Sequence, residues 1–233
     1  MMEFTLAALT FAASHSVPMR PRIREKLIHQ FGSRTFWTLY GLVSVVSLAW
    51  LVDAAARAPH VELWAPTAWQ RWVPFLVMPI VFGIISLTIA APNPLSFGGR
   101  HHERFEPENP GIAGFARHPL LVALALWAFA HVIPNGDLAH VLLFGALGLF
   151  AVIGMTLIDR RRRAEFGNAE WTRLAEGTSN WPLHAWFTGR STPKIMVSVQ
   201  RIGFAVLFWA CLIWAHATLF GVSPWPVQQQ HWL

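Results

Sequence analysis

The sequence predicts an all-α fold, a polytopic bundle of transmembrane helices. Of its 233 residues, 54% are hydrophobic and only 13% are charged, against roughly 25% charged in soluble domains. The mean hydropathy is +0.41, and thirteen tryptophans are present. This composition is typical of an integral membrane protein rather than of a soluble enzyme.

Six apolar runs are the predicted spans of a single membrane domain over residues 1–233. They are residues 4–19, 35–52, 72–91, 119–133, 138–158 and 202–220. Several approach the ~20 residues that a helix needs to cross ~30 Å of hydrocarbon. The first and fourth runs are shorter, which suggests local thinning of the bilayer or shielding by neighbouring helices.

The basic residues predict how these spans are oriented. If the N-terminus is outside, the loops after the first, third and fifth spans face the cytoplasm, and 16 of the 18 Lys and Arg residues lie in or beside them, Arg100 included. Only Arg57 and Arg71 remain outside. The positive-inside rule therefore predicts six spans with both termini on the non-cytoplasmic side of the membrane.

The composition also limits the classes of function. The net charge is +6, but the charges alternate with apolar runs and form no aromatic-basic patch, so membrane topology explains them better than nucleic-acid binding does. The single Cys211 excludes an internal disulfide and a cysteine-based zinc site. No Ser-His-Asp set, phosphate loop or Rossmann glycine pattern is evident. The expected partner is the lipid bilayer, and an apolar small-molecule substrate, a homo-oligomer or a membrane redox partner is compatible with it.

Four of the eleven histidines lie in or beside the predicted spans: His15, His118, His131 and His216. Neutral imidazole is a good iron ligand and tolerates burial better than a carboxylate does. Two such histidines on different helices can hold a b-type haem, and no C-x-x-C-H motif is present for a covalently attached one. The alternative is that each histidine only makes a hydrogen bond between helices.

Rotation and depth give a first pairing of these histidines. His118 and His131 are thirteen residues apart, which is ~1,300° along a helix and leaves about 140° between their side chains. They cannot face the same iron, and depth along the spans pairs His15 with His118. Arg117 and His118 at a helix N-terminus also suit an anionic group of a cofactor, or alternatively serve as interfacial charge anchors.

Two polar turns supply further candidate residues. Asn93 and Ser96 begin a cytoplasmic loop, where a turn that ends the helix is the simpler interpretation. Asn135 and Asp137 flank a glycine in a predicted outer turn.

Several short motifs, taken in order, resemble the NnrU family of bacterial membrane proteins. They are His15-Ser16, Asn93-Pro94-Leu95-Ser96-Phe97-Gly98, Arg117-His118-Pro119, Ala130-His131 and Asn135-Gly136-Asp137. The family is associated with denitrification and with nitrite and nitric oxide metabolism. It is similar along most of its length to the plant and cyanobacterial ζ-carotene isomerases, and the likeness continues through Asp159-Arg160-Arg161 and Thr178-Ser179 to His231-Trp232.

The resemblance implies a cofactor and a pair of ligands. The isomerases are membrane enzymes with haem b, and the matching positions here are His15 and His131. The paired histidines that the isomerases carry on the fifth span are missing from the region of Phe144 and Gly145. The implied function is thus a haem-dependent redox enzyme or isomerase acting on an apolar substrate, with the carotenoid itself in doubt.

Two alternatives remain at this stage. Arg117-His118-Pro119 is also similar to the motif with which isoprenylcysteine and phospholipid methyltransferases help bind S-adenosylmethionine, although Leu120 and Leu121 replace the Tyr and Gly that usually follow. The other alternative is a non-catalytic assembly factor for denitrification reductases.

Overall fold

The structure is a computed structural model that describes residues 1–98, 101–192, 194–195 and 197–226. These residues form α- and 3₁₀-helices and no β-strand, and a single isolated bridge joins Glu62 and Asp137. The predicted all-α fold class is confirmed. Arg100 and the His231-Trp232 motif lie outside the described residues.

Helices form over each of the six predicted runs. They are α1 (Met2–Ser16), α3 (Ser33–Ala56), α4 (Trp72–Thr88), α6 (Pro119–Val132), α7 (Leu138–Phe166) and α10 (Val199–Phe220). Four segments are long and apolar enough to cross a membrane, namely α3, α7, α10 and the stretch Ala68–Thr88 that contains α4, while α6 is a shorter apolar helix. The chain therefore has the character of a membrane protein, and the count of six spans and their orientation stay predictions from charge.

Two helices end at other positions than the apolar runs do, for local reasons. The fifth apolar run ends at residue 158, whereas α7 continues to Phe166, where Arg162 and Glu165 pair along the helix at 2.8 Å and Gly167 with φ +79° ends it. The third apolar run extends to residue 91, whereas α4 ends at Thr88, because Ala90 adopts φ +60° two residues before Pro92.

Shorter helices occupy the loops between these runs. They are α2 (Pro21–Phe31), η1 (Ala68–Arg71), η2 (His102–Arg104), α5 (Ile112–Phe115), α8 (Asn168–Ala175) and α9 (His184–Phe187). Pro21 stands in the first turn of α2, where its missing N–H costs no hydrogen bond, and Gly32 with φ +80° ends the helix. Apolar periodicity alone did not reveal these helices, because they are short or polar.

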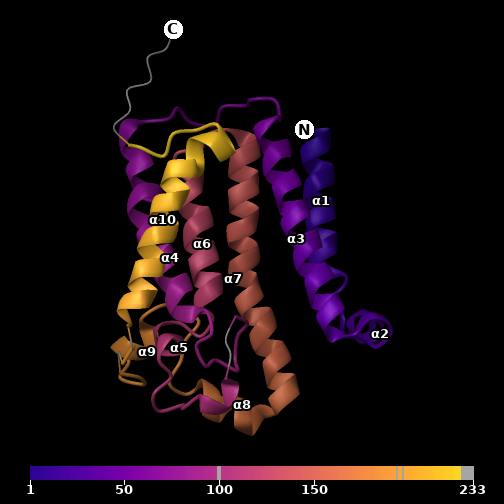
Figure 1. Cartoon of the computed structure of the whole chain (residues 1–233), viewed down its shortest axis with the longest axis vertical. Coiled ribbons are helices and arrows are strands. Elements are labelled where there is room, and N and C mark those ends of the chain that lie inside the picture. Colours follow the sequence, from indigo (N-terminus) through magenta and orange to yellow (C-terminus); the bar gives the residue numbers. More distant parts are fainter. Residues whose placement is uncertain (99–100, 193, 196, 227–233) are drawn as a thin grey trace. The chain divides into compact units, whose positions relative to one another are not determined.

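The chain forms two compact units. Unit 1 is Met1–Ala65 with Asn135–Leu143. In it, α1 packs along α3, and α2 contacts α3 (Figure 1). The turn before α7 closes on the segment after α3, because Leu63 N–H donates to the Gly136 carbonyl at 2.7 Å and Leu138 N–H donates to the Val61 carbonyl at 2.9 Å.

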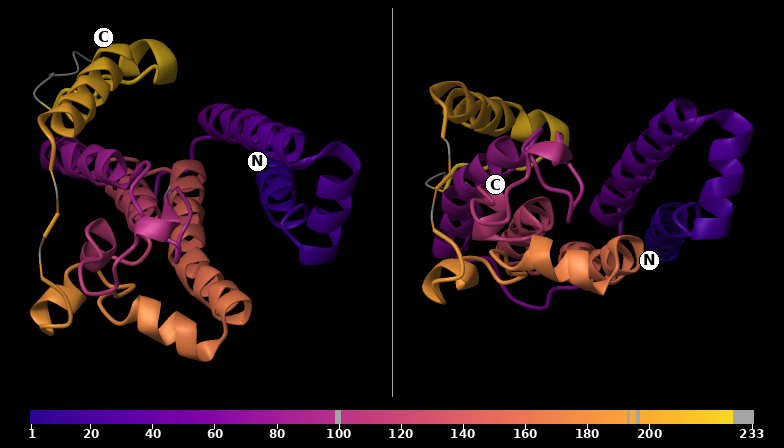
Figure 2. Two further views of the ribbon diagram at one scale, coloured as in Figure 1. Left: turned by 60° about the horizontal axis from the view of Figure 1, so that its bottom comes forward. Right: turned by 90° about the horizontal axis from the view of Figure 1, so that it is seen from below.

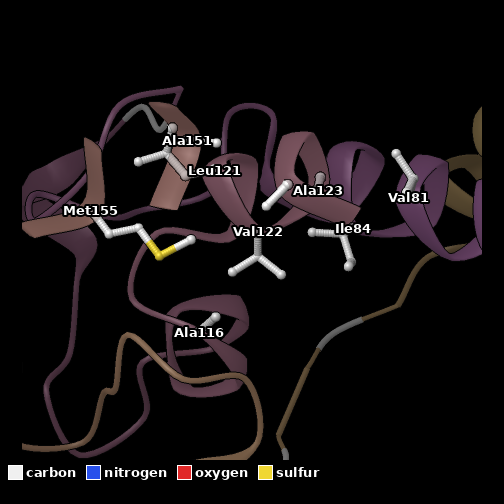
Figure 3. Packing of buried hydrophobic residues seen from close by; sticks show 9 residues of the cluster. Val81, Ile84, Ala116, Leu121, Val122, Ala123, Ala151 and Met155 are labelled. Carbon is white, nitrogen blue, oxygen red and sulfur yellow. The ribbon is translucent and has the colours of Figure 1, made fainter. Parts of the chain in front are cut away.

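Unit 2 is Pro66–Pro134 with Phe144–Leu233. In it, α4 packs against both α6 and α10, as Figure 2 shows for α10 along α4. The buried core joins α4, α6 and α7 through side chains such as Val81, Val122 and Met155 (Figure 3). Alanines in this core, among them Ala123 and Ala151, let the helices approach closely.

Candidate functional site

A buried polar cluster surrounds the residues just before α6. Arg117 is 8% exposed and His118 is fully buried. Pro119 follows them in the first turn of α6, where its fixed φ suits the helix and its missing N–H is not needed. Because a buried charge is costly unless it is paired, the partners of Arg117 and His118 decide what this cluster can do.

His118 connects a serine to a carboxylate. Its Nδ1 lies 3.0 Å from the Ser96 hydroxyl, and its Nε2 lies 3.0 Å from Asp159 Oδ1. An ionised carboxylate only accepts hydrogen bonds, so His118 Nε2–H donates to Asp159, while Nδ1 shares a hydrogen bond with the Ser96 hydroxyl. The structure therefore contains a Ser-His-Asp set that the sequence spacing concealed. Ser96 is only 1% exposed, so the set holds a loop in place rather than presenting a nucleophile.

Arg117 neutralises the same carboxylate. Its Nη1 donates to Asp159 Oδ2 at 2.6 Å, and its Nε donates to the Thr178 hydroxyl at 2.8 Å. Burial lowers the pKa of Arg117, and although Asp159 opposes this effect, the net direction is below the ordinary value. A guanidinium nevertheless stays protonated in proteins. Asn180 Nδ2 also donates to Asp159 Oδ2, at 2.8 Å.

The backbone around Arg117 is held as tightly as its side chain. The Asn93 side-chain amide donates to the Arg117 carbonyl at 3.0 Å, and Arg117 N–H donates to the Ser179 carbonyl at 2.7 Å. The loop after α4 and the segment after α8 are thereby joined to the start of α6. Trp171 of α8 lies against the Arg117 guanidinium, 4.9 Å from its ring centroid.

The structure thus brings four predicted residues together, namely Asn93, Ser96, Arg117 and His118. Sequence reasoning did not place Asp159, Thr178 and Asn180 among the site residues. One signal for Asp159 was available, because it is the first carboxylate after a long apolar run, where a buried arginine would need it.

His131 lies elsewhere in unit 2, near the end of α6. Its Nδ1 is 2.7 Å from the Trp127 carbonyl one turn earlier. The rings of Trp127 and Phe144 flank it, with centroids 5.6 and 5.2 Å away. A ring nitrogen that faces a carbonyl must carry the proton, so the lone pair of His131 is on Nε2.

His15 has a similar setting in unit 1. Its Nδ1 is 3.0 Å from the Phe11 carbonyl, again one helical turn earlier. The Phe11 and Tyr40 rings lie 4.0 and 5.9 Å from it. The two predicted axial histidines therefore belong to different units, and each has the same ring orientation relative to its own helix.

Asn135 and Asp137 form the turn that starts α7 in unit 1. Asp137 Oδ1 accepts from the His140 N–H at 3.2 Å, and its Oδ2 lies 2.7 Å from His140 Nδ1. Burial raises the pKa of Asp137, but the hydrogen bonds and charge of His140 outweigh it, and the net direction is below the usual value. These contacts are those of a helix cap.

Within the described part of the chain, no three or more His, Cys, Asp and Glu side chains converge as a metal-binding group. A haem iron differs from a bare metal site, because the porphyrin supplies four ligands and the protein needs to add only one or two. The relevant features are single histidines on apolar helices, as found at His15, His131 and His216.

Comparisons with known proteins place the chain in a family. No curated protein and no solved structure matches it. The family described as NnrU protein matches residues 3–224, which is nearly the whole chain and includes the polar cluster and the histidines of the apolar helices. The protein is a member of the NnrU family.

Proposed function

We propose that this protein binds haem b within the membrane, through histidines of its apolar helices, and acts in nitrite and nitric oxide metabolism during denitrification. The observation that carries the proposal is the orientation of His131. Its Nδ1–H is held by the Trp127 carbonyl at 2.7 Å, so its Nε2 has the lone pair that iron requires. Histidines that bind metals almost always have their other ring N–H held in this way.

The surroundings of His131 fit the same cofactor. Trp127 and Phe144 flank the imidazole, and both can pack against a flat apolar macrocycle. His15 supports the proposal from unit 1, since its Nδ1 is held by the Phe11 carbonyl and its neighbours are also aromatic. The resemblance names these two histidines as the axial pair.

Bound haem would supply an iron that changes oxidation state and ligation, which is the chemistry needed by a redox enzyme or a redox-gated isomerase. The chain's contribution is to orient the imidazoles, exclude water with apolar helices and admit an apolar substrate from the bilayer. This role belongs to α6 and its neighbours rather than to the polar cluster at Arg117.

Two tests examine the proposal. The full-length protein, purified in detergent from haem-replete cells, should give a b-type pyridine haemochrome spectrum, and adding nitric oxide to the reduced protein should shift its Soret band. His131→Ala should lose most of the bound haem, whereas His184→Ala, at an exposed histidine in α9, should retain it. A wild-type protein that purifies without haem under these conditions overturns the proposal.

No specific observation on the described residues supports either of the two alternative functions. A methyltransferase would use Arg117 and His118 on its cofactor, but both ring nitrogens of His118 already have partners within the protein. The Arg117 guanidinium is likewise engaged with Asp159 and Thr178. An assembly factor would need a docking surface, and no contact among the described residues identifies one.

A further inference from the structure

A partly open cavity of about 170 Å³ lies between α4 and α10 in unit 2. The two helices run side by side and contact each other (Figure 2). Beyond one end of the cavity, the rings of Phe75 and Trp209 lie 5.6 Å apart. At the other end, the Ser86 hydroxyl donates to the Arg201 carbonyl at 2.7 Å. The cavity is therefore a feature of two packed helices, bounded by contacts at both ends.

The lining of this cavity is apolar except at one end. Its apolar members include Pro79, Gly83 and Leu87 of α4 and Ala205 and Val206 of α10. Leu87 follows Pro79 by eight residues, which corresponds to roughly 12 Å of helix. One leaflet makes up about half of the ~30 Å of hydrocarbon in a bilayer. The cavity thus extends over most of the depth that a lipid acyl chain occupies.

A glycine leaves room for such a chain on the α4 side. A Cβ built on Gly83 would meet no atom of the described residues within 4 Å. Gly83 lies within α4, so a larger side chain there would extend into the cavity without straining the backbone. Gly203 of α10 has equally open surroundings but is not among the residues that line the cavity. The two glycines therefore offer a matched pair of positions for testing what the cavity holds.

Arg201 is the one charged residue among the described residues that line the cavity. It stands in the first turn of α10 and is half-buried. Its Nη1 donates to the Ser86 carbonyl at 2.6 Å and to the Leu87 carbonyl at 2.8 Å. These carbonyls belong to the last turn of α4, where the helix dipole favours a cation. Capping of α4 thus accounts for Nη1 of Arg201 and for no other nitrogen of the guanidinium.

The remaining edge of the Arg201 guanidinium has the geometry that binds an anion. A guanidinium has five N–H donors in a planar fork, and those of Nε and Nη2 point along one edge. Among the described residues, no carboxylate forms an ion pair with Arg201, and only Nη1 of its side chain has a hydrogen-bond partner. The edge matches two oxygens of a phosphate in a bidentate contact. This cation beside an apolar cavity is complementary to an anionic amphiphile.

We propose that the cavity binds one anionic phospholipid, with an acyl chain between α4 and α10 and the head-group phosphate on Nε and Nη2 of Arg201. The distribution of basic residues puts the start of α10 on the predicted cytoplasmic side, so the lipid comes from that leaflet. Basic pockets between transmembrane helices on this side bind anionic head groups. A zwitterionic lipid carries its own positive charge next to the phosphate and gains less from Arg201. The contact needs no bound haem.

Native mass spectrometry of the full-length protein in detergent measures the binding of the first lipid. Dioleoyl phosphatidylglycerol should bind wild type about tenfold more tightly than dioleoyl phosphatidylcholine, as a hydrogen-bonded charge pair provides. Arg201→Gln should abolish this preference, whereas Arg22→Gln, at an exposed arginine of α2, should keep it. Equal binding of the two lipids by wild type, or an equal loss of preference in the two variants, overturns the proposal.

A second pair of variants keeps the test decisive if Arg201→Gln loses the cap on α4 and fails to fold. Gly83→Leu fills the cavity and leaves the hydrogen bonds of Arg201 in place, so it should weaken phosphatidylglycerol binding by about tenfold. Gly203→Leu should leave that binding unchanged. Equal binding by Gly83→Leu and Gly203→Leu overturns the proposal. Displacement of phosphatidylglycerol by an equal concentration of sodium oleate also overturns it, because the cavity would then belong to a free fatty acid.

Discussion

The carboxylate of Asp159 contacts two buried side chains, a guanidinium and an imidazole. Arg117 and His118 both contact its carboxylate, and Asn180 adds a third hydrogen bond. The Arg117 side chain is 10% exposed and that of Asp159 is 15% exposed, so water can replace little of what their pairing provides. Removing the carboxylate charge would leave the guanidinium buried without a counter-charge. Such a loss lowers the free energy of unfolding more than replacing both partners by apolar residues does.

Asp159→Asn should therefore destabilise the protein strongly, by roughly 3–5 kcal/mol. Thermal unfolding in detergent, followed by tryptophan fluorescence, measures the change. Asp53→Asn is the matched control, because Asp53 pairs with Arg57 at positions that are 61% and 55% exposed. Exposed pairs contribute about 0–1 kcal/mol, so the control should hardly change. Equal effects of the two substitutions would contradict the assigned importance of the buried cluster.

Asp137 gives a prediction about pH. Its pKa is lowered in the folded protein, because the contacts with His140 outweigh its burial. A carboxyl group with a depressed folded pKa stabilises the fold above its unfolded pKa, which is about 3.9, and loses that contribution as the pH falls through the folded value. The difference in melting temperature between wild type and Asp137→Asn should shrink as the pH falls below about 4. A difference that keeps growing below that pH would contradict this assignment.

At the scale of the elements, α6 and α7 meet where one helix lacks a side chain. A Cβ built on Gly148 of α7 would lie 2.6 Å from the Phe129 ring of α6, whereas one built on Gly145 would meet nothing within 4 Å. The glycine thus lets an aromatic ring sit directly on the backbone of its neighbour. Close approach of this kind is how helices associate in lipid, where the hydrophobic effect between them is weak.

Gly148→Val should disturb this contact and destabilise unit 2 by about 1–3 kcal/mol, as overpacking does. Gly145→Val changes the helix propensity of the same helix equally but should cost much less. The measurement is the melting temperature of both variants in one detergent. A Gly145→Val protein as unstable as Gly148→Val would indicate that loss of glycine, rather than the Phe129 contact, is responsible.

At the scale of the whole molecule, the testable statement is the orientation in the membrane. His60 follows α3 on the predicted outer side, and Glu103 lies in the predicted cytoplasmic loop; both are exposed. The only native cysteine, Cys211, is also exposed, so it has to be replaced first. Single cysteines can then report which loop faces which side.

In a Cys211→Ala background, His60→Cys should react with a membrane-impermeant maleimide added to intact spheroplasts. Glu103→Cys should react only after the membrane is permeabilised, because the loops rich in arginine stay in the cytoplasm. Labelling is read by a mass shift on a gel. The opposite pattern would reverse the predicted topology.

The all-helical architecture and the six apolar helices could be predicted from sequence, because runs of apolar residues must form helices in lipid to satisfy their own backbone. The ends of these helices were less predictable. Where α7 stops depends on Gly167 and on pairs such as Arg162 with Glu165, which stabilise a helix beyond its apolar stretch.

The candidate site, too, could be predicted from the sequence only in part. Asn93, Ser96, Arg117 and His118 could be singled out individually, because polar residues at the boundary of apolar runs are unusual. Their shared partner could not, since Asp159 is forty-one residues from His118 in the chain and the contact exists only when α7 packs beside α6. Sequence spacing carries no information about such a distance.

The sequence by itself determined that this is a helical membrane protein of the NnrU family, with histidines on apolar helices and its basic residues gathered in alternate loops. These properties depend on local composition and on the cost of exposing backbone and charge to lipid. Only the tertiary structure decided that Ser96, His118 and Asp159 form one buried chain of hydrogen bonds. The physical reason is that packing brings together side chains from helices far apart in sequence, and no local pattern encodes which helices become neighbours.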